Sequence, residues 1–178
     1  MTTIAVARPE TGEFAPFYAN YIASIPPIED AVGLLTMQNN RLVRQLAALG
    51  DEQANYRYAD GKWSIKELLG HMTDAERIFA YRLLRIGRGD ATPLPGFEEN
   101  DYVPAGKFDA RAMTDVLEEW IAVRTATIAL VRGLPSEAWT RRGVANGNPI
   151  SARALVYVML GHIDHHSQVL EERYGVAR

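Results

Sequence analysis

Apolar residues recur every three to four positions in four long segments of this chain. In the first segment they follow Pro26 and Pro27 and stop before Gly50 (Ile28, Val32, Leu35, Leu42, Leu46 and Leu49). This spacing places them on one face of a helix, and a glycine after the last apolar position is typical of a helix end. The segment therefore predicts a first amphipathic helix that ends at about Leu49.

A second helix is predicted to begin at Ser64. Its hydroxyl can accept a hydrogen bond from the amide of Glu67, while the Glu67 carboxylate accepts one from the amide of Ser64, which is the capping-box pattern. Helical periodicity continues to about Ile86, directly before Gly87. Residues 87–107 then contain many Gly, Pro, Asp and Asn residues, so we expect an ordered but irregular connection. Long connections of this kind often cover a functional site.

Two further helices are predicted in the second half of the chain. Asp109 is expected to cap the third helix, whose apolar residues continue to Gly133 (Met113, Val116, Leu117, Trp120, Val123, Ile128 and Val131). Ser151 is expected to cap the fourth helix, which runs to about Tyr174. The stretch between these helices is rich in turn residues, so we predict a loop there. No segment shows a pattern that predicts a β-strand.

These helices indicate an all-α fold, and four helices with a long second connection are typical of a four-helix bundle. The chain has 178 residues, of which 47% are hydrophobic, and this is enough for one core. We therefore predict a single domain over residues 1–178. Residues 1–25 are too aromatic for a disordered tail, so we expect this N-terminal arm to pack along the bundle (Phe14, Phe17, Tyr18 and Tyr21).

Charge and composition narrow the range of partners. The net charge is −3 and no run of Lys or Arg occurs, so we expect neither a nucleic acid nor an anionic membrane as partner. The first ten residues lack the pattern of a secretory signal and no apolar window is long enough to span a bilayer, so we expect a cytoplasmic protein. The chain has no cysteine, so any thiol in its chemistry must come from another molecule.

All four histidines fall in two helical segments. His162 and His166 are four residues apart and stack on one face of the fourth helix, while His165 lies slightly to the side. His71 shares a stripe of the second helix with apolar residues, so it is expected to point inward (Leu68, Ala75 and Ile78). Three imidazoles leave a tetrahedral ion one position for water or substrate. The pattern predicts a three-histidine metal site across the bundle.

The alternative is that His71 is an ordinary core histidine and that the other three partly form a solvated face. All four histidines lie in two helical segments that are expected to face inward, and this favours the metal site. Packing neutral imidazoles against one another would not stabilise an apolar core. A zincin peptidase is excluded, since Ile163 follows His162 where that motif requires glutamate. Asp74 and Asp164 could orient imidazoles as hydrogen-bond acceptors. The alternative for both is a solvated helix carboxylate, and for Asp164 this alternative is favoured.

Three segments resemble the DinB/YfiT-like family of metal-dependent proteins. Residues 62–71 (KWSIKELLGH), followed by residues 74–77 (DAER), are similar to the family's second-helix signature. The loop residues between Leu94 and Val103 and the last-helix residues 161–166 (GHIDHH) also resemble its motifs. The resemblance covers about residues 28–174 and agrees in order and spacing.

The resemblance implies an up-down-down-up four-helix bundle that binds a divalent metal, often nickel or zinc, through His71, His162 and His166. It also implies homodimers, and relatives include transferases that use low-molecular-weight thiols such as bacillithiol or mycothiol. One departure leaves His165 as a rival ligand. Relatives often carry glutamine three residues after the final histidine, whereas Gln168 is two residues after His166 and three after His165. The stacking of residues four apart on a helix favours His166.

The pattern and the resemblance together predict an enzyme in which a divalent metal activates a small thiol, or water, for attack on a small electrophilic substrate. A metal-dependent hydrolase, with Asp74 as the proton acceptor, is one alternative. A non-enzymatic metal-dependent binding or stress protein is another, and a closed site with four protein ligands would favour it. Phe97 and Tyr102 are candidates for substrate contacts, whereas Trp63 is expected to pack in the core.

Overall fold

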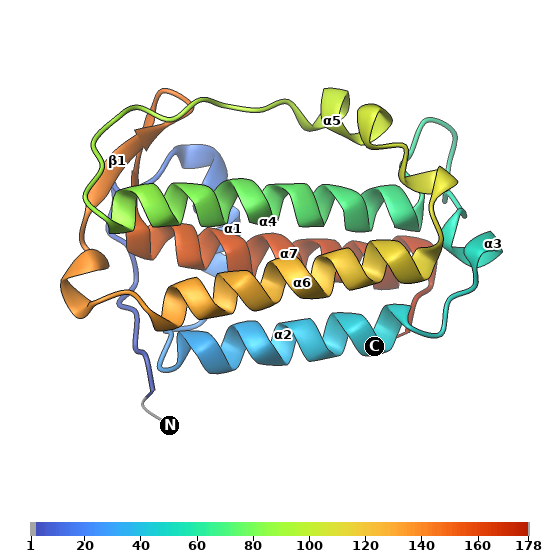
Figure 1. The fold of residues 1–178 in the computed structure, drawn as a ribbon, viewed down its shortest axis with the longest axis horizontal. Coiled ribbons are helices and arrows are strands. Elements are labelled where there is room, and N and C mark those ends of the chain that lie inside the picture. Colours follow the sequence, from blue (N-terminus) through green and yellow to red (C-terminus); the bar gives the residue numbers. More distant parts are fainter. Residues whose placement is uncertain (1–2, 178) are drawn as a thin grey trace.

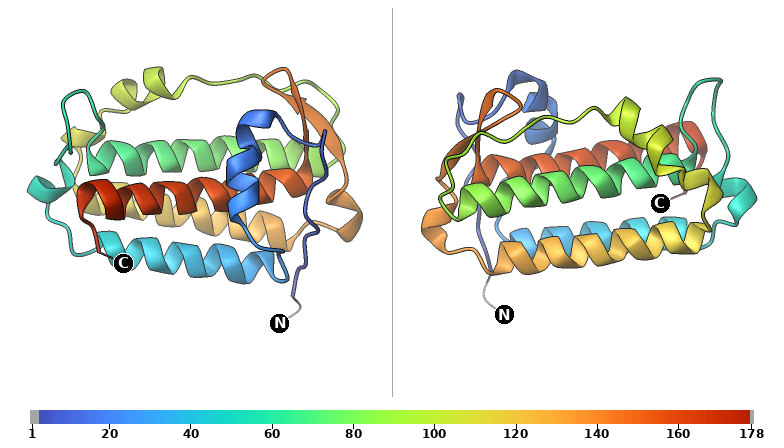
Figure 2. Two further views of the ribbon diagram at one scale, coloured as in Figure 1. Left: turned by 180° about the vertical axis from the view of Figure 1, so that it is seen from behind. Right: turned by 45° about the horizontal axis from the view of Figure 1, so that its top comes forward.

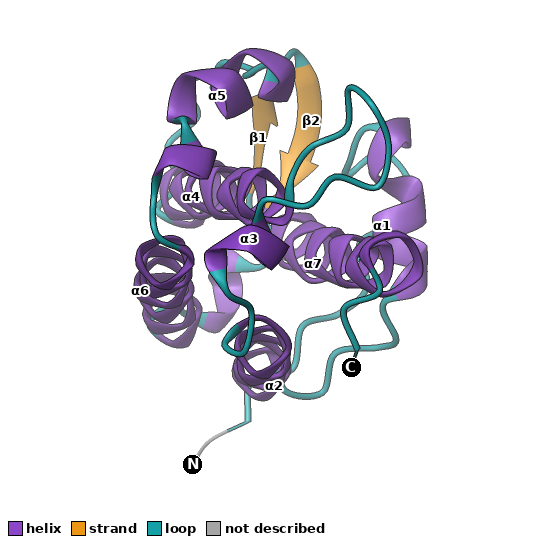
Figure 3. Ribbon diagram, turned by 90° about the vertical axis from the view of Figure 1, so that its right-hand side faces the viewer, coloured by secondary structure: helices purple, strands orange, loops and turns teal. Residues whose placement is uncertain are grey.

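Four long helices lie side by side in this computed structural model, which describes residues 3–177. They are α2 (Ala31–Leu46), α4 (Ile65–Gly87), α6 (Met113–Arg132) and α7 (Ala152–Tyr174). Figure 1 shows α2 and α7 running in one direction and α4 and α6 in the other, and Figure 3 shows the four helices end-on as a square. The predicted all-α, up-down-down-up bundle is confirmed.

The parallel arrangement of α4 and α6 explains the long connection between them. A helix of this length spans about 35 Å, and the chain must cover that distance again before α6 can begin. Residues 88–112 make this return along the outside of α4 (Figures 1 and 2). The connection is less irregular than predicted, because it contains the helix α5 (Glu99–Gly106) and the 3-10 helix η2 (Phe108–Ala110).

A β-hairpin joins α6 to α7, where the sequence analysis wrongly predicted only a loop. Strand β1 (Arg142–Ala145) pairs antiparallel with β2 (Asn148–Ser151). Asn146 and Gly147 form the turn, and both have positive φ angles, 51° and 72°. Asn-Gly is the preferred pair for a two-residue hairpin turn because both residues tolerate this conformation. The turn signal was visible in the sequence, but the strands are too short to show an alternating pattern.

Two of the three predicted N-caps are confirmed. The Ser64 hydroxyl accepts from the amide of Glu67 at 3.0 Å, and the Glu67 carboxylate accepts from the amide of Ser64 at 2.9 Å. The Ser151 hydroxyl accepts from the amide of Ala154 at 3.1 Å, which fixes the start of α7. These bonds satisfy amides that have no partner inside their own helix.

The predicted cap at Asp109 is wrong. The Asp109 carboxylate instead accepts from the Ser64 hydroxyl at 2.5 Å and pairs with Arg57 at 2.5 Å. Helix α6 begins only at Met113, and its first amide donates to the carboxylate of Asp51 at 2.7 Å. The cap therefore comes from a residue 62 positions earlier, a long-range contact that spacing along the chain does not reveal.

The N-terminal arm lies against the bundle. Val6 forms a β-bridge with Ile28, and the Arg8 guanidinium donates to the carbonyl of Ile22 at 2.9 Å. Helix α1 (Ala19–Ser24) follows the 3-10 helix η1 and packs across α7 (Figure 2, left). Within residues 3–177, no helix combines the length and the apolar character needed to cross a membrane. The remaining short elements are α3 (Asp51–Ala54), η1 (Pro16–Tyr18) and η3 (Ser136–Ala138).

Two apolar clusters fill the bundle and meet near the middle of α4 and α7. On α7, residues up to Leu160 belong to one cluster, whereas Ile163 and Leu170 belong to the other. On α4, Met72 and the residues before it belong to the second cluster, and those from Ala75 onward to the first. The predicted histidine site on these two helices therefore lies at the boundary between the clusters.

Glu13 ties the arm to the hairpin and to α7. Its carboxylate is buried and accepts hydrogen bonds from the Arg153 guanidinium at 2.6 Å, the Ser151 hydroxyl at 2.8 Å and the Arg142 guanidinium at 2.8 Å. The hydrogen bond from Arg153 is the main reason why the pKa of Glu13 is lowered from 4.5 to about 2. The network holds three segments of the chain together.

Replacing Glu13 by Gln is expected to lower the free energy of unfolding at pH 7 by roughly 3 kcal/mol, because it leaves the buried Arg153 guanidinium without its main counter-charge. The folded-state pKa lies below the ordinary value, so this contribution is complete above pH about 4.5 and is lost as the pH falls toward about 2. Urea unfolding of the wild type and of Glu13→Gln at pH 7 and pH 3 measures this contribution. Glu29→Gln, at an exposed carboxylate, serves as the control and should change stability by less than about 0.5 kcal/mol. A difference between Glu13→Gln and wild type that does not shrink at pH 3 would contradict this account.

Candidate metal centre

Three histidines meet between α4 and α7. The Nε2 atom of His162 lies 3.1 Å from Nε2 of His71 and 3.1 Å from Nε2 of His166. One ring nitrogen from each of the three lies within 4.8 Å of the other two. His71 and His162 are each 5% exposed, and His166 is partly buried. The antiparallel packing of the two helices thus brings together residues that are 91 positions apart in the sequence.

Hydrogen bonding alone does not satisfy this cluster. A neutral imidazole nitrogen carries either one proton or one lone pair in the ring plane, so it makes one hydrogen bond, either as donor or as acceptor. His162 Nε2 has two close nitrogen neighbours and can satisfy only one of them. A cation that accepts a lone pair from each of the three nitrogens satisfies all of them at once. The donor set is therefore the kind that a metal ion requires.

The spacing and the protonation state fit a bound ion. Two nitrogens that each lie about 2.0–2.1 Å from one ion are about 3.3 Å apart at a tetrahedral angle and about 2.9 Å apart at a right angle. The observed separations of 3.1 Å fall between these values. Burial lowers the pKa of His71 to about 4 and lowers the pKa of His162 and His166 well below the ordinary value. The imidazoles are therefore neutral at pH 7, which is the form that binds metal.

His165 is not a member of this group of three histidines. It is exposed, and its ring lies 5.6 Å from the ring of Tyr21 and 4.9 Å from that of His166. The structure thus brings His166 rather than His165 to His71 and His162, in keeping with the spacing of four residues along the helix. Gln168, which favoured His165 in the sequence, is exposed and donates to Glu172 at 2.7 Å. The assignment of His71, His162 and His166 as ligands stays a prediction.

A glycine precedes each of the two buried histidines and lets another segment approach. A side chain at Gly161 would overlap the backbone of Tyr21, so the glycine lets α1 cross α7 closely at this position. The ring of Tyr21 then lies edge-on to His162, with 5.7 Å between ring centroids. A side chain at Gly70 would overlap the ring of Phe108. Both contacts place neighbouring elements against the helix turns that carry the histidines.

A cavity of about 310 Å³ opens beside His166. Trp63, Asn100 and His165 also line it, and the ring of Trp63 lies 4.9 Å from the ring of His71. Trp63 was expected in the core, and Asn100 was not among the predicted site residues. Trp63 directly precedes Ser64, the N-cap of the helix that carries His71. This position in the sequence could have indicated that Trp63 lies near the site.

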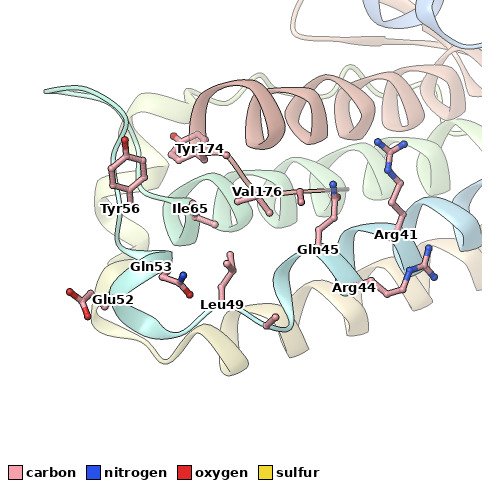
Figure 4. A pocket seen from close by; sticks show the side chains of 13 residues that line it. Arg41, Arg44, Gln45, Leu49, Glu52, Gln53, Tyr56, Ile65, Tyr174 and Val176 are labelled. Carbon is pink, nitrogen blue, oxygen red and sulfur yellow. The ribbon is translucent and has the colours of Figure 1, made fainter.

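The hydroxyl of Tyr174 donates to the carbonyl of Trp63 at 2.6 Å, which fixes one wall of this cavity. Tyr174 also lines a larger cavity, of about 710 Å³, at the end of the bundle (Figure 4). Gln45, Leu49 and Tyr56 line that second cavity, and none of the histidines does. The smaller cavity is therefore the one that gives access to the candidate metal centre.

Phe97 and Tyr102, the predicted substrate contacts, lie in the connection that passes over α4. Their rings are 5.6 Å apart, and the Arg82 guanidinium holds this segment by donating to the carbonyl of Pro95 at 2.8 Å. Among the residues of this connection, Asn100 lines the cavity beside His166 and these two aromatics do not. Their role in substrate binding stays a prediction.

The two carboxylates considered for the site have other partners. Asp74 pairs with Arg77 at 3.3 Å, and burial raises the pKa of its carboxyl group. Arg77 also pairs with Glu119 of α6 at 2.6 Å, which places Asp74 on the side of α4 that faces α6. Asp164 accepts from the amide of Gln38 at 2.8 Å. The structure does not bring either carboxylate into the histidine cluster, and the catalytic role of Asp74 stays untested.

Comparisons with known proteins give matches to a family model and to individual relatives. Residues 10–170 match the family model of the DinB superfamily. A protein of Oceanobacillus iheyensis, provisionally named a metal-dependent hydrolase, is 24% identical over 147 residues that span 80% of this chain and 83% of that protein. A similarly named protein of Geobacillus thermodenitrificans is 31% identical over 140 residues, which span 72% of this chain and 71% of that protein.

Solved structures show the same fold. YfiT from Bacillus subtilis, described provisionally as a metal-dependent hydrolase with an unusual four-helix bundle topology, is similar with a TM-score of 0.71 and 17% identity over 94% of this chain and 97% of its own. A mycothiol-dependent maleylpyruvate isomerase is similar with a TM-score of 0.66 and 15% identity over 80% of this chain. The similarity covers 60% of that enzyme, so a substantial part of it has no counterpart here.

Single replacements of the histidines by alanine should separate ligands from neighbours. Loss of His71, His162 or His166 removes one of three nitrogen donors, so we expect zinc or nickel affinity to fall at least a hundredfold while the helical circular dichroism is retained. His165→Ala is the matched control on the same helix and should bind metal like the wild type. Calorimetric titration of each apoprotein measures this. Loss of metal binding in His165→Ala together with normal binding in His166→Ala would reverse the ligand assignment.

Proposed function

Because this chain belongs to the DinB superfamily, we propose that it is an enzyme that requires a divalent metal ion, nickel or zinc, held by His71, His162 and His166. One observation carries the proposal: the Nε2 atom of His162 has two imidazole nitrogens at 3.1 Å and can hydrogen-bond to only one of them. The provisional naming of both relatives as metal-dependent hydrolases supports the requirement for a metal.

When bound, such an ion supplies Lewis-acid chemistry, because it lowers the pKa of a thiol or water that binds to it. The chain's own residues hold and shield that centre. Burial of the three imidazoles keeps them neutral, so they remain electron-pair donors at neutral pH. Trp63 and Tyr21 pack against His71 and His162 and limit the access of water. His166 lines the cavity through which a small molecule can reach the site.

A low-molecular-weight thiol is the co-substrate that we propose first. The chain contains no cysteine, so a sulfur nucleophile must come from another molecule. One protein of similar fold is a mycothiol-dependent isomerase. The reaction proposed is attack of the thiol on a small electrophilic substrate held in the cavity beside His166. The two provisionally named hydrolases among the relatives support water as the alternative nucleophile.

The site favours an enzyme over a structural metal protein. Structural zinc sites are usually closed by four protein ligands, whereas catalytic sites use three. Among residues 3–177, the group of potential ligands at this place contains the three histidines and no carboxylate. His165, which could have closed the site, is exposed and is not a member of this group. A metal-dependent binding protein is therefore the less favoured alternative.

The remaining expectations concern location and partners. We expect a small molecule as substrate, and the cavity of about 310 Å³ beside His166 is of a size that supports this. Homodimerisation, a cytoplasmic location and the lack of nucleic-acid binding stay predictions.

The choice between thiol and water can be tested with the zinc-loaded and nickel-loaded protein. We expect turnover of electrophiles such as chlorodinitrobenzene or epoxides only when a small thiol is added, because the chain has no sulfur nucleophile of its own. The His162→Ala variant should show no turnover above the rate without protein. Hydrolysis of an activated ester without thiol, at a rate that also depends on His162, would instead support the hydrolase.

A further inference from the structure

One ring nitrogen of His166 lacks a hydrogen-bond partner. Within residues 3–177, the Nδ1 atom of His166 is buried and forms no hydrogen bond. The other ring nitrogen, Nε2, lies 3.1 Å from Nε2 of His162. If Nε2 gives its lone pair to an ion, the neutral ring must carry its proton on Nδ1. Metal binding therefore turns Nδ1 into a buried N–H donor that needs an acceptor.

Metal-binding histidines normally have such an acceptor. Their second ring nitrogen almost always donates its hydrogen to a carboxylate, a carbonyl group or water, and this bond fixes the orientation of the ring. Water does not take this role in the arrangement observed, because Nδ1 of His166 is shielded from solvent. The acceptor must therefore come from a protein group that borders His166.

The cavity beside His166 contains few acceptors. No Asp or Glu of residues 3–177 is among its lining residues. Of the lining side chains, Asn100 carries a carbonyl oxygen, and Tyr58 and Tyr174 carry hydroxyl oxygens. The Tyr174 hydroxyl is fixed by its own hydrogen bond to the carbonyl of Trp63, at 2.6 Å. An amide carbonyl accepts hydrogen bonds better than a phenol hydroxyl does, so Asn100 is the first candidate and Tyr58 is its rival.

The contacts of Asn100 leave its carbonyl oxygen available. The side-chain Nδ2 donates to the Glu98 carboxylate at 2.9 Å, and the backbone amide of Asn100 donates to the same oxygen at 3.1 Å. The amino end of the side chain therefore faces Glu98, and Oδ1 is left as an acceptor. Helix α5, which carries Asn100, passes along the outside of α4 (Figure 1) and buries only Val103. A small shift of α5 can thus move Asn100 without disturbing the core.

We propose that Asn100 is a positioning residue of the metal centre, whose Oδ1 accepts a hydrogen bond from Nδ1–H of His166 and holds that imidazole toward the ion. The two groups are not hydrogen-bonded in this structure. The donor arises when the ion takes the lone pair of Nε2, so the inference rests on the proposed function. It gives the connection over α4 a role, because a residue of α5 completes a site that α4 and α7 build.

Two substitutions of Asn100 separate this role from a structural one. Asn100→Ala removes the acceptor, so the affinity for zinc in calorimetric titration is expected to fall about tenfold to a hundredfold. Asn100→Asp keeps an oxygen at this position and should bind zinc at least as tightly as the wild type, because a carboxylate is the stronger acceptor. Neither variant can donate to Glu98 from its side chain. A merely structural role of Asn100 would therefore be lost equally in both.

NMR of the zinc-loaded protein, labelled with nitrogen-15 in its histidines, reports on the bond itself. The Nδ1 proton of His166 should resonate downfield in the wild type, because a hydrogen-bonded proton is deshielded. It should move upfield in Asn100→Ala and remain downfield in Asn100→Asp. Tyr58→Phe removes a hydroxyl from the same cavity, and Asn40→Ala changes an exposed asparagine at a different groove. Both controls should keep the wild-type signal and zinc affinity.

Three results would overturn the proposal. They are equal losses of zinc affinity in Asn100→Ala and Asn100→Asp, an unchanged His166 signal in Asn100→Ala, and loss of the downfield signal in Tyr58→Phe. If the wild type binds neither zinc nor nickel, the proposed function fails, and the same spectra of the apoprotein decide the role of Asn100. A His166 Nδ1 proton signal that depends on Asn100 would then support the hydrogen bond, and its absence would refute it.

Discussion

The double contact of His162 Nε2 is the constraint on which this interpretation depends. Two imidazole nitrogens lie 3.1 Å from one ring nitrogen that can form only one hydrogen bond. Burial adds to the constraint, because it lowers the pKa of all three rings and so removes the option of protonating them near pH 7. A shared cation resolves both problems. Without one, the cluster would place unsatisfied polar atoms inside the bundle at a free-energy cost of about 1–3 kcal/mol each.

Several close contacts between elements lie around the three histidines. The histidines lie where the two apolar clusters meet. The polar groups are therefore confined to one cross-section of the bundle, with apolar core on either side. Gly161 lets α1 cross α7 at the same level and brings Tyr21 to His162. The arm that carries α1 is in turn held by Glu13, whose partners lie on the hairpin and at the start of α7. The hairpin and the arm therefore help to build one wall of the site.

The sequence predicted those features that depend on local spacing. Helical periodicity gave the four long helices, and the spacing of His162 and His166 placed them on one face. Apart from the candidate histidine site, contacts between distant segments were not predicted. Asp109 looked like a cap because of its position in the chain, but Asp51 takes that role across the fold. Asn100 lines the cavity because the connection after α4 returns along the bundle, which residue types alone do not indicate.

X-ray absorption spectroscopy of the zinc-loaded protein would test the central claim most directly, because it reports the number and type of atoms bound to the ion. The account predicts three imidazole nitrogens at about 2.0–2.1 Å and one oxygen from solvent. The solvent oxygen should be replaced by sulfur at about 2.3 Å when a small thiol is added. Fewer than three imidazoles, or a fourth protein ligand that excludes the thiol, would contradict it.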